Sequence, residues 1–172
     1  MDTRQKIFSA ADLNYLRSAV RLARRGYGRT SPNPMVGAVL VKGGKIIGRG
    51  WHRRAGLPHA EIEALRDAQK HSYNPRGATL YATLEPCCTH GCTPPCTDAI
   101  IAAGIKRVVI GTVDPNPKHA GRAFKILKRA GIEVSSLGKG RARHSVRAVS
   151  DFTRQRRAED CAPYLHGMEV VG

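Results

Sequence analysis

The sequence predicts an α/β fold in which one mixed, five-stranded sheet carries helices on both faces. Two observations lead to this prediction. A β-rich run over residues 35–51 is interrupted by Gly43 and Gly44, a two-residue loop suited to the tight turn of an antiparallel hairpin. Further along the chain, apolar strand-like segments alternate with helical ones, which implies parallel crossover connections. With 172 residues the chain is long enough to bury one core of this kind.

The first helix is predicted over residues 10–26, where apolar residues recur at helical spacing. Ser9 and Asp12 resemble a capping box at its start, and Gly26 is a stop signal. A second helix is predicted to begin near His59, directly after Pro58.

The remaining elements follow from short apolar runs bounded by glycine and proline. Strands are predicted over residues 78–84, 106–112 and 132–137, and helices over 96–104 and 119–131. Residues 1–137 are therefore expected to form one domain. The rest, 138–172, is expected to be a basic C-terminal extension or connector.

The composition is strongly basic, with 29 Lys and Arg residues against 13 Asp and Glu and a formal net charge of +16. A surplus of this size favours anionic partners. The basic segment 138–157 is interpreted as a solvated helical face in preference to a binding stripe. Neither a signal peptide nor an apolar run of membrane-spanning length is found, so we expect a cytoplasmic protein with no membrane association.

Four of the five cysteines lie within the stretch "LEPCCTHGCTPPCTD": Cys87, Cys88, Cys92 and Cys96. In a reducing compartment such a cluster is more often a metal or catalytic site than a disulfide framework. The odd number of cysteines also argues against disulfides.

A catalytic zinc site uses three protein ligands and leaves its fourth position to water. His59, Cys87 and Cys96 form an accepted ligand set for such a site. Glu61, in the first turn of the helix that starts at His59, is placed to move a proton between water and a substrate nitrogen. A structural zinc is the main alternative, and it would take its fourth ligand from Cys88 or Cys92.

The pattern H-x-E followed by P-C is a signature of zinc nucleobase deaminases. Beyond that signature, "TSPNPMVGAVLVKGGKIIGRGWH", "PHAE", "TLYATLEPC", "HGCTPPCTDAIIAAGIKRVVIGTVDPNP" and "AGIEV" together resemble the deaminase domain of the bifunctional riboflavin-biosynthesis deaminase/reductase family. The resemblance covers residues 12–137. It implies a cytidine-deaminase-like three-layer αβα sandwich and hydrolytic removal of the 2-amino group of 2,5-diamino-6-ribosylamino-4(3H)-pyrimidinone 5′-phosphate.

The resemblance also implies roles for individual residues. His59, Cys87 and Cys96 match the zinc ligands of the family, and Glu61 matches its proton shuttle. The positions that match substrate contacts are Asn33, His52, Ala60, Asp114 and Asn116. Asn33 and Asn116 each stand between prolines, so both would also serve as ordinary turn residues.

The chain departs from the family pattern at Cys92, where the family usually carries a lysine or arginine that helps to hold the substrate phosphate. His90, Lys118 and Arg122 are the candidates to replace that cation. No reductase domain is found after the connector-like C-terminal segment, so a stand-alone or truncated deaminase is expected. The family association also predicts a homo-oligomer.

Three hypotheses follow. The first is the riboflavin-pathway deaminase. The second, motivated by Cys92, is a related deaminase retuned to another aminopyrimidine or purine. The third and least favoured, motivated by the basic charge, is a nucleic-acid-binding protein with a structural zinc. Aromatic residues make up only 5% of the chain, which speaks weakly against a stacking surface for single strands.

Overall fold

A computed structural model describes residues 8–90, 94–115 and 119–137. In chain order the elements are α1 (Ala10–Ala23), a 3₁₀ turn η1 (Arg24–Gly26), β1 (Gly37–Lys42), β2 (Lys45–Trp51), α2 (Ala60–Lys70), β3 (Thr79–Leu84), α3 (Cys96–Ala102), β4 (Arg107–Thr112), α4 (Arg122–Arg129) and β5 (Glu133–Ser136).

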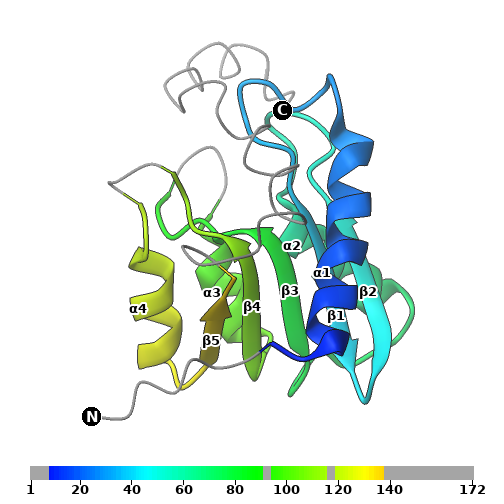
Figure 1. Cartoon of the computed structure of the whole chain (residues 1–172), viewed down its shortest axis with the longest axis vertical. Helices are drawn as coiled ribbons and strands as arrows, with labels where there is room; N and C mark the ends of the chain where they lie inside the picture. Colours follow the sequence, from blue (N-terminus) through cyan, green and yellow to red (C-terminus); the bar gives the residue numbers. More distant parts are fainter. Residues whose placement is uncertain (1–7, 91–93, 116–118, 138–172) are drawn as a thin grey trace, which may run out of the picture.

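The five strands form one mixed sheet in the order β2-β1-β3-β4-β5. β1 pairs antiparallel with both β2 and β3, whereas β3–β4 and β4–β5 are parallel. The hairpin turns at Gly43 and Gly44, which both have positive φ angles, as the turn requires. The predicted mixed, five-stranded sheet is thus confirmed (Figure 1).

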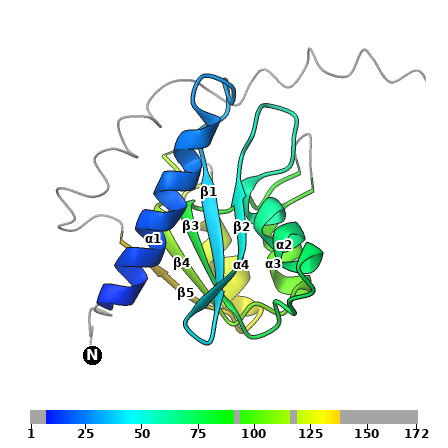
Figure 2. The ribbon, with the colours of Figure 1, turned by 90° about the vertical axis from the view of Figure 1, so that its right-hand side faces the viewer.

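Helices cover both faces of the sheet, and the alternation of side chains along β1 shows how. Val39 and Val41 point into a core that α1 closes with Leu16 and Leu22. Leu40, on the opposite face, belongs to a larger core shared with α2, α3 and α4. Figure 2 shows α1 on one side of the sheet and α2 and α3 on the other. The architecture therefore has three layers.

Very close packing of α2 on β2 fixes the position of that helix. A Cβ atom added to Gly50 would collide with the carbonyl oxygen of Ala60, and one added to Gly48 with that of Ala64. Ala60, Ala64 and Ala68 face these glycines and are fully buried. Small residues on both elements let the helix backbone approach the sheet, and the first turn of α2 is thereby held in place.

Three helices differ from the prediction at their ends. α3 ends at Ala102, two residues before its predicted end. α1 ends at Ala23 and continues as a 3₁₀ turn to Gly26, where an uninterrupted helix was expected. α4 begins at Arg122, three residues later than expected, because Gly121 adopts a left-handed conformation that an α-helix cannot contain. Within the described residues, no helix is long and apolar enough to cross a bilayer.

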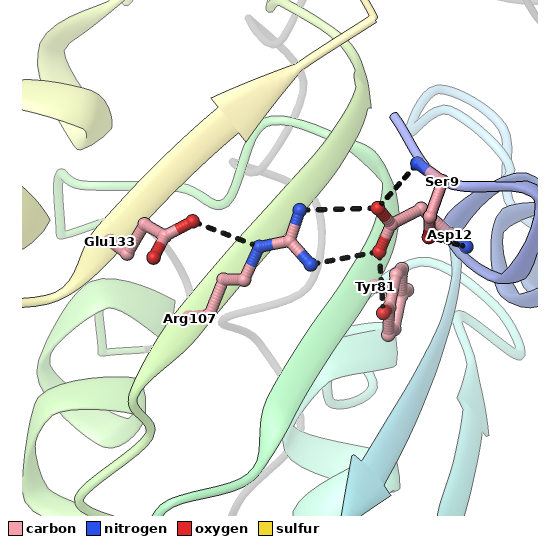
Figure 3. Close-up of polar contacts among 5 residues, drawn as sticks. All are labelled: Ser9, Asp12, Tyr81, Arg107 and Glu133. Carbon is pink, nitrogen blue, oxygen red and sulfur yellow. Dashed lines mark hydrogen bonds and ion pairs between the residues drawn. The ribbon is translucent and has the colours of Figure 1, made fainter. Parts of the chain in front are cut away.

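The predicted capping box is present, and it belongs to a larger polar network (Figure 3). Asp12 accepts hydrogen bonds from the Ser9 N–H at 3.0 Å and from the Tyr81 hydroxyl at 2.8 Å. Arg107 donates to both Asp12 oxygens, at 2.8 and 3.3 Å. Its Nε also forms an ion pair with Glu133 at 3.1 Å. The network ties α1 to β3, β4 and β5.

Candidate metal centre and active site

Three predicted ligands meet where α2, α3 and the end of β3 converge. His59 is the N-cap of α2, Cys87 follows β3, and Cys96 is the first residue of α3. The Nδ1 atom of His59 lies 3.4 Å from Cys87 Sγ and 3.3 Å from Cys96 Sγ. The three ligand atoms lie within 4.8 Å of one another.

This geometry fits a zinc ion. Nitrogen and sulfur ligands bound tetrahedrally to zinc lie about 3.5 to 3.8 Å apart, given zinc–ligand bonds of roughly 2.0 to 2.3 Å. The observed separations of 3.3 and 3.4 Å are close to those values. Among the residues that the structure describes, this is the one group found that could hold a metal, and Cys88 is not part of it. Cys92 lies outside the described residues.

The two thiols influence each other strongly. The hydrogen bond with the Cys96 thiol is the main cause that lowers the pKa of Cys87 to about 4, and the Cys96 backbone N–H also donates to Cys87 Sγ at 3.3 Å. The same contact with Cys87 raises the pKa of Cys96, and burial adds to the rise. One sulfur is therefore readily a thiolate, while the second gains its charge most easily beside a cation. A divalent metal supplies that cation.

Glu61 lies beside the ligands and is only 3% exposed. Its Oε2 is 3.8 Å from Cys96 Sγ. Burial raises the pKa of Glu61. A carboxyl group whose pKa is shifted toward neutrality is suited to accept a proton and return it within one reaction cycle.

Asn33, which is half-buried, and His52, which is buried, form a pair next to His59. The His52 ring nitrogens lie 3.2 Å from the Pro58 carbonyl oxygen and 3.2 Å from Asn33 Nδ2. Because a carbonyl can only accept and an amide nitrogen can only donate, His52 carries its proton on Nδ1. Burial lowers the pKa of His52, which favours this neutral form. The rings of His52 and His59 make an edge contact with centroids 5.4 Å apart.

The other predicted site residues differ in placement. Ala60 is fully buried, so only its backbone could meet a substrate. Asp114 is half-buried after β4, while Arg122 and His90 are exposed. Cys88, the alternative fourth ligand of a structural zinc, is half-buried, and burial raises the pKa of its thiol. Asn116 and Lys118 lie outside the described residues.

The sequence of this chain matches a known protein family. Residues 9–112, more than half of the chain, match the cytidine and deoxycytidylate deaminase zinc-binding region. The chain belongs to this deaminase family. The predicted family, fold class and zinc cofactor are thereby confirmed.

Curated relatives of this deaminase are proteins of riboflavin biosynthesis. The chain is 57% identical over 123 residues to the riboflavin biosynthesis protein RibD of Aquifex aeolicus, with 72% of this chain and 34% of the relative covered. It is 52% identical over 132 residues to the chloroplastic riboflavin biosynthesis protein PYRD of Arabidopsis thaliana, with 77% and 30% covered. The chain thus spans about a third of the length of these relatives.

Solved structures of deaminases are similar in fold to this chain. The diaminohydroxyphosphoribosylaminopyrimidine deaminase/reductase of Thermotoga maritima matches with a TM-score of 0.70 and 52% identity, covering 73% of this chain and 36% of that one. The Aspergillus oryzae Rib2 deaminase, solved in complex with DARIPP, matches with a TM-score of 0.62 and 25% identity, covering 83% and 99%.

One buried acidic residue next to this deaminase site was not predicted from the sequence. Glu85 is 5% exposed, two positions before Cys87, and its carboxylate accepts hydrogen bonds from backbone N–H groups that follow β4. The signal in the sequence is an acidic residue between an apolar strand and a proline, in "TLEPC". A buried acidic side chain at the end of a strand requires hydrogen-bond donors, and this requirement is the signal that could have identified Glu85.

Proposed function

We propose that the chain is a zinc-dependent hydrolase that removes the 2-amino group of 2,5-diamino-6-ribosylamino-4(3H)-pyrimidinone 5′-phosphate. The observation that carries the proposal is the buried Glu61 beside a His-Cys-Cys ligand group, with Oε2 3.8 Å from Cys96 Sγ. The names of the curated relatives support the choice of substrate. So does the name of the similar Thermotoga maritima protein, a diaminohydroxyphosphoribosylaminopyrimidine deaminase/reductase.

In this proposal His59, Cys87 and Cys96 hold the zinc, which when bound supplies the Lewis acid that makes water nucleophilic at neutral pH. Glu61 accepts a proton from the attacking water as the oxygen bonds to C2 of the pyrimidine. It then gives that proton to the amino nitrogen as the carbon–nitrogen bond breaks. The products are ammonia and 5-amino-6-ribosylaminouracil 5′-phosphate.

Asn33 and His52 orient the pyrimidine. Since Nδ2 of Asn33 lies 3.2 Å from His52 Nε2, the amide is held in one orientation and its Oδ1 can accept a hydrogen bond from the base. Asp114 and Asn116 are proposed to bind the ribose. His90, Lys118 and Arg122 are proposed to bind the phosphate, in place of the cation that the family usually carries at the position of Cys92. A contact with Ala60 would come from its backbone.

The test is an ammonia-release assay of the zinc-loaded protein on the diaminopyrimidinone nucleotide, with zinc content measured in parallel. We expect turnover well above background with about one zinc per chain. Cytidine, deoxycytidylate and guanine are the comparison substrates. Absence of ammonia from the diaminopyrimidinone nucleotide, in protein that carries zinc, would refute the assignment.

Cys92 favours a second candidate, a deaminase of the same family retuned to a base or nucleoside without a phosphate. Rates on the phosphorylated and dephosphorylated substrate separate the two. The riboflavin-pathway enzyme should prefer the phosphorylated form, and equal rates would favour the retuned enzyme.

Three further predictions belong to this proposal. The deaminase domain is expected to span 1–137, with 138–172 as a basic extension or connector. The protein is expected to be a cytoplasmic homo-oligomer. Sedimentation of the full chain measures its oligomeric state directly.

A further inference from the structure

Glu85 is a buried carboxylate that the metal centre does not use. It lies between the end of β3 and Pro86, and both of its oxygens accept backbone hydrogen bonds. Oε2 accepts from the N–H of Asp114 at 3.1 Å and of Gly121 at 3.0 Å. Oε1 accepts from the N–H of Ala123 at 3.1 Å. One side chain thus joins the end of β3 to the residues that follow β4 and to the first turn of α4.

These bonds meet a local need of the backbone. The first N–H groups of an α-helix have no partner within the helix, and α4 has no side-chain cap of its own at Gly121. Three N–H donors also offset the cost of burying the carboxylate. Replacement by an uncharged or shorter side chain would leave buried N–H groups without an acceptor.

The residues that Glu85 holds are those next to proposed substrate contacts. Asp114 donates its own N–H to Glu85, and Gly121 and Ala123 flank Arg122 on either side. The backbone that carries the proposed ribose-binding carboxylate and the proposed phosphate-binding guanidinium is therefore held by one side chain from the segment that follows β3.

The metal ligands have separate supports. The carbonyl oxygen of Cys87 accepts from the Thr97 N–H at 3.2 Å, and its Sγ accepts from the Cys96 N–H at 3.3 Å. Neither bond involves the Glu85 carboxylate. Loss of that carboxylate should disturb the residues after β4 more than the ligand group.

We propose that Glu85 is a positioning residue that sets the affinity for the ribosyl phosphate part of the substrate without taking part in the chemistry. This inference rests on the proposed function. It assigns Glu85 to substrate binding through Asp114 and the start of α4, and it leaves proton transfer to Glu61.

The kinetic test compares Glu85→Gln and Glu85→Ala with the wild-type enzyme. Glutamine keeps one acceptor oxygen but presents an NH₂ group to N–H donors, so we expect KM to rise about tenfold, and further in Glu85→Ala. We expect kcat to stay within about twofold, since the reacting groups are unchanged, and zinc content to stay the same. An unchanged KM in both variants overturns the proposal, as does a fall in kcat with loss of zinc.

Asp12→Asn is the matched control. This substitution also removes the charge of a buried carboxylate that accepts a backbone N–H. The partner of Asp12, Arg107, lies at the start of β4, whereas the residues that Glu85 binds lie beyond the end of that strand. Asp12→Asn should lower the melting temperature and leave KM unchanged. If KM rises equally in Asp12→Asn and Glu85→Gln, general destabilisation explains the effect and the proposal fails.

Amide hydrogen exchange of the zinc-loaded protein tests the positioning step without any substrate. In the wild type, the N–H groups of Asp114, Gly121 and Ala123 should be protected, and in Glu85→Gln they should exchange at least about tenfold faster. Lack of protection in the wild type overturns the proposal even if neither variant folds. If the wild type releases no ammonia but these amides are protected by Glu85, the proposed substrate is wrong and the positioning role stands.

Discussion

Two buried carboxylates at different places in this molecule have opposite chemistry. Asp12, at the start of α1, is 4% exposed, and Glu61, in the first turn of α2, is 3% exposed. Burial alone would raise the pKa of each. Hydrogen bonds from Arg107 and Tyr81 nevertheless lower the pKa of Asp12 to about 2, whereas the pKa of Glu61 is raised.

The difference lies in the partners. Asp12 accepts hydrogen bonds from a guanidinium, a hydroxyl and a backbone N–H. These bonds stabilise its negative charge, so the carboxylate stays deprotonated at neutral pH. The side-chain partner found for Glu61 is the Cys96 thiol at 3.8 Å, a weak donor. Equal burial therefore yields a structural anchor in one case and a group suited to proton transfer in the other.

Removing the carboxylate of Glu61 should have the largest effect on activity. Glu61→Gln keeps the shape of the side chain but cannot accept a proton, so kcat should fall about a thousandfold or more. Zinc content should be unchanged, because His59, Cys87 and Cys96 are intact. Ammonia release and metal analysis of the same preparation measure both. Loss of zinc together with activity would contradict the role assigned to Glu61.

Displacing α2 should affect both stability and activity. In Gly50→Ala the new methyl group would collide with the Ala60 carbonyl oxygen, next to His59 and Glu61. We expect a loss of about 3 kcal/mol in unfolding free energy and a clear fall in kcat. Urea unfolding and the ammonia assay measure these.

Gly43→Ala is the control for that substitution. Gly43 has a positive φ of 57°, and a Cβ there meets open space. It should cost about 1 kcal/mol through backbone strain and leave kcat unchanged. Equal effects of the two substitutions on kcat would contradict a specific role for the close packing of α2.

Much of this site could be predicted from the sequence because its signals are local. The capping box needs only Ser9 and Asp12, the hairpin only Gly43 and Gly44, and the ligand set only residue types that follow prolines or begin helices. The start of α4 was misplaced because the left-handed conformation of Gly121 depends on the path of the chain after β4.

The contacts that were missed join distant parts of the chain. Arg107 and Asp12 are 95 residues apart, and their pairing depends on the order of strands in the sheet. The partners of Glu85 are backbone N–H groups, which every residue except proline possesses, so no residue type at 114, 121 or 123 reveals them.

The contribution of Asp12 to the unfolding free energy should be lost at low pH. Because its pKa in the folded protein is about 2, below the ordinary 3.8, its contribution to stability is present above pH 3.8 and is lost as pH falls toward 2. A depression of roughly two pKa units corresponds to about 2.5 kcal/mol. Urea unfolding of the wild type and Asp12→Asn between pH 7 and pH 2 measures it. The difference between them should shrink on acidification, and a difference independent of pH would contradict this account.

The smallest effect is expected at Glu63, two residues from Glu61 on the same helix. Its carboxylate forms ion pairs with Arg53 at 3.1 Å and Arg66 at 3.4 Å, and both arginine side chains are largely exposed. Ion pairs near solvent are worth about 0 to 1 kcal/mol because water screens them. Glu63→Gln should therefore change the unfolding free energy by less than about 1 kcal/mol and leave kcat within about twofold. A large loss of kcat in Glu63→Gln would contradict this comparison. It would mean that an acid of α2 contributes to catalysis by lying near the metal centre, without the burial beside a ligand that distinguishes Glu61.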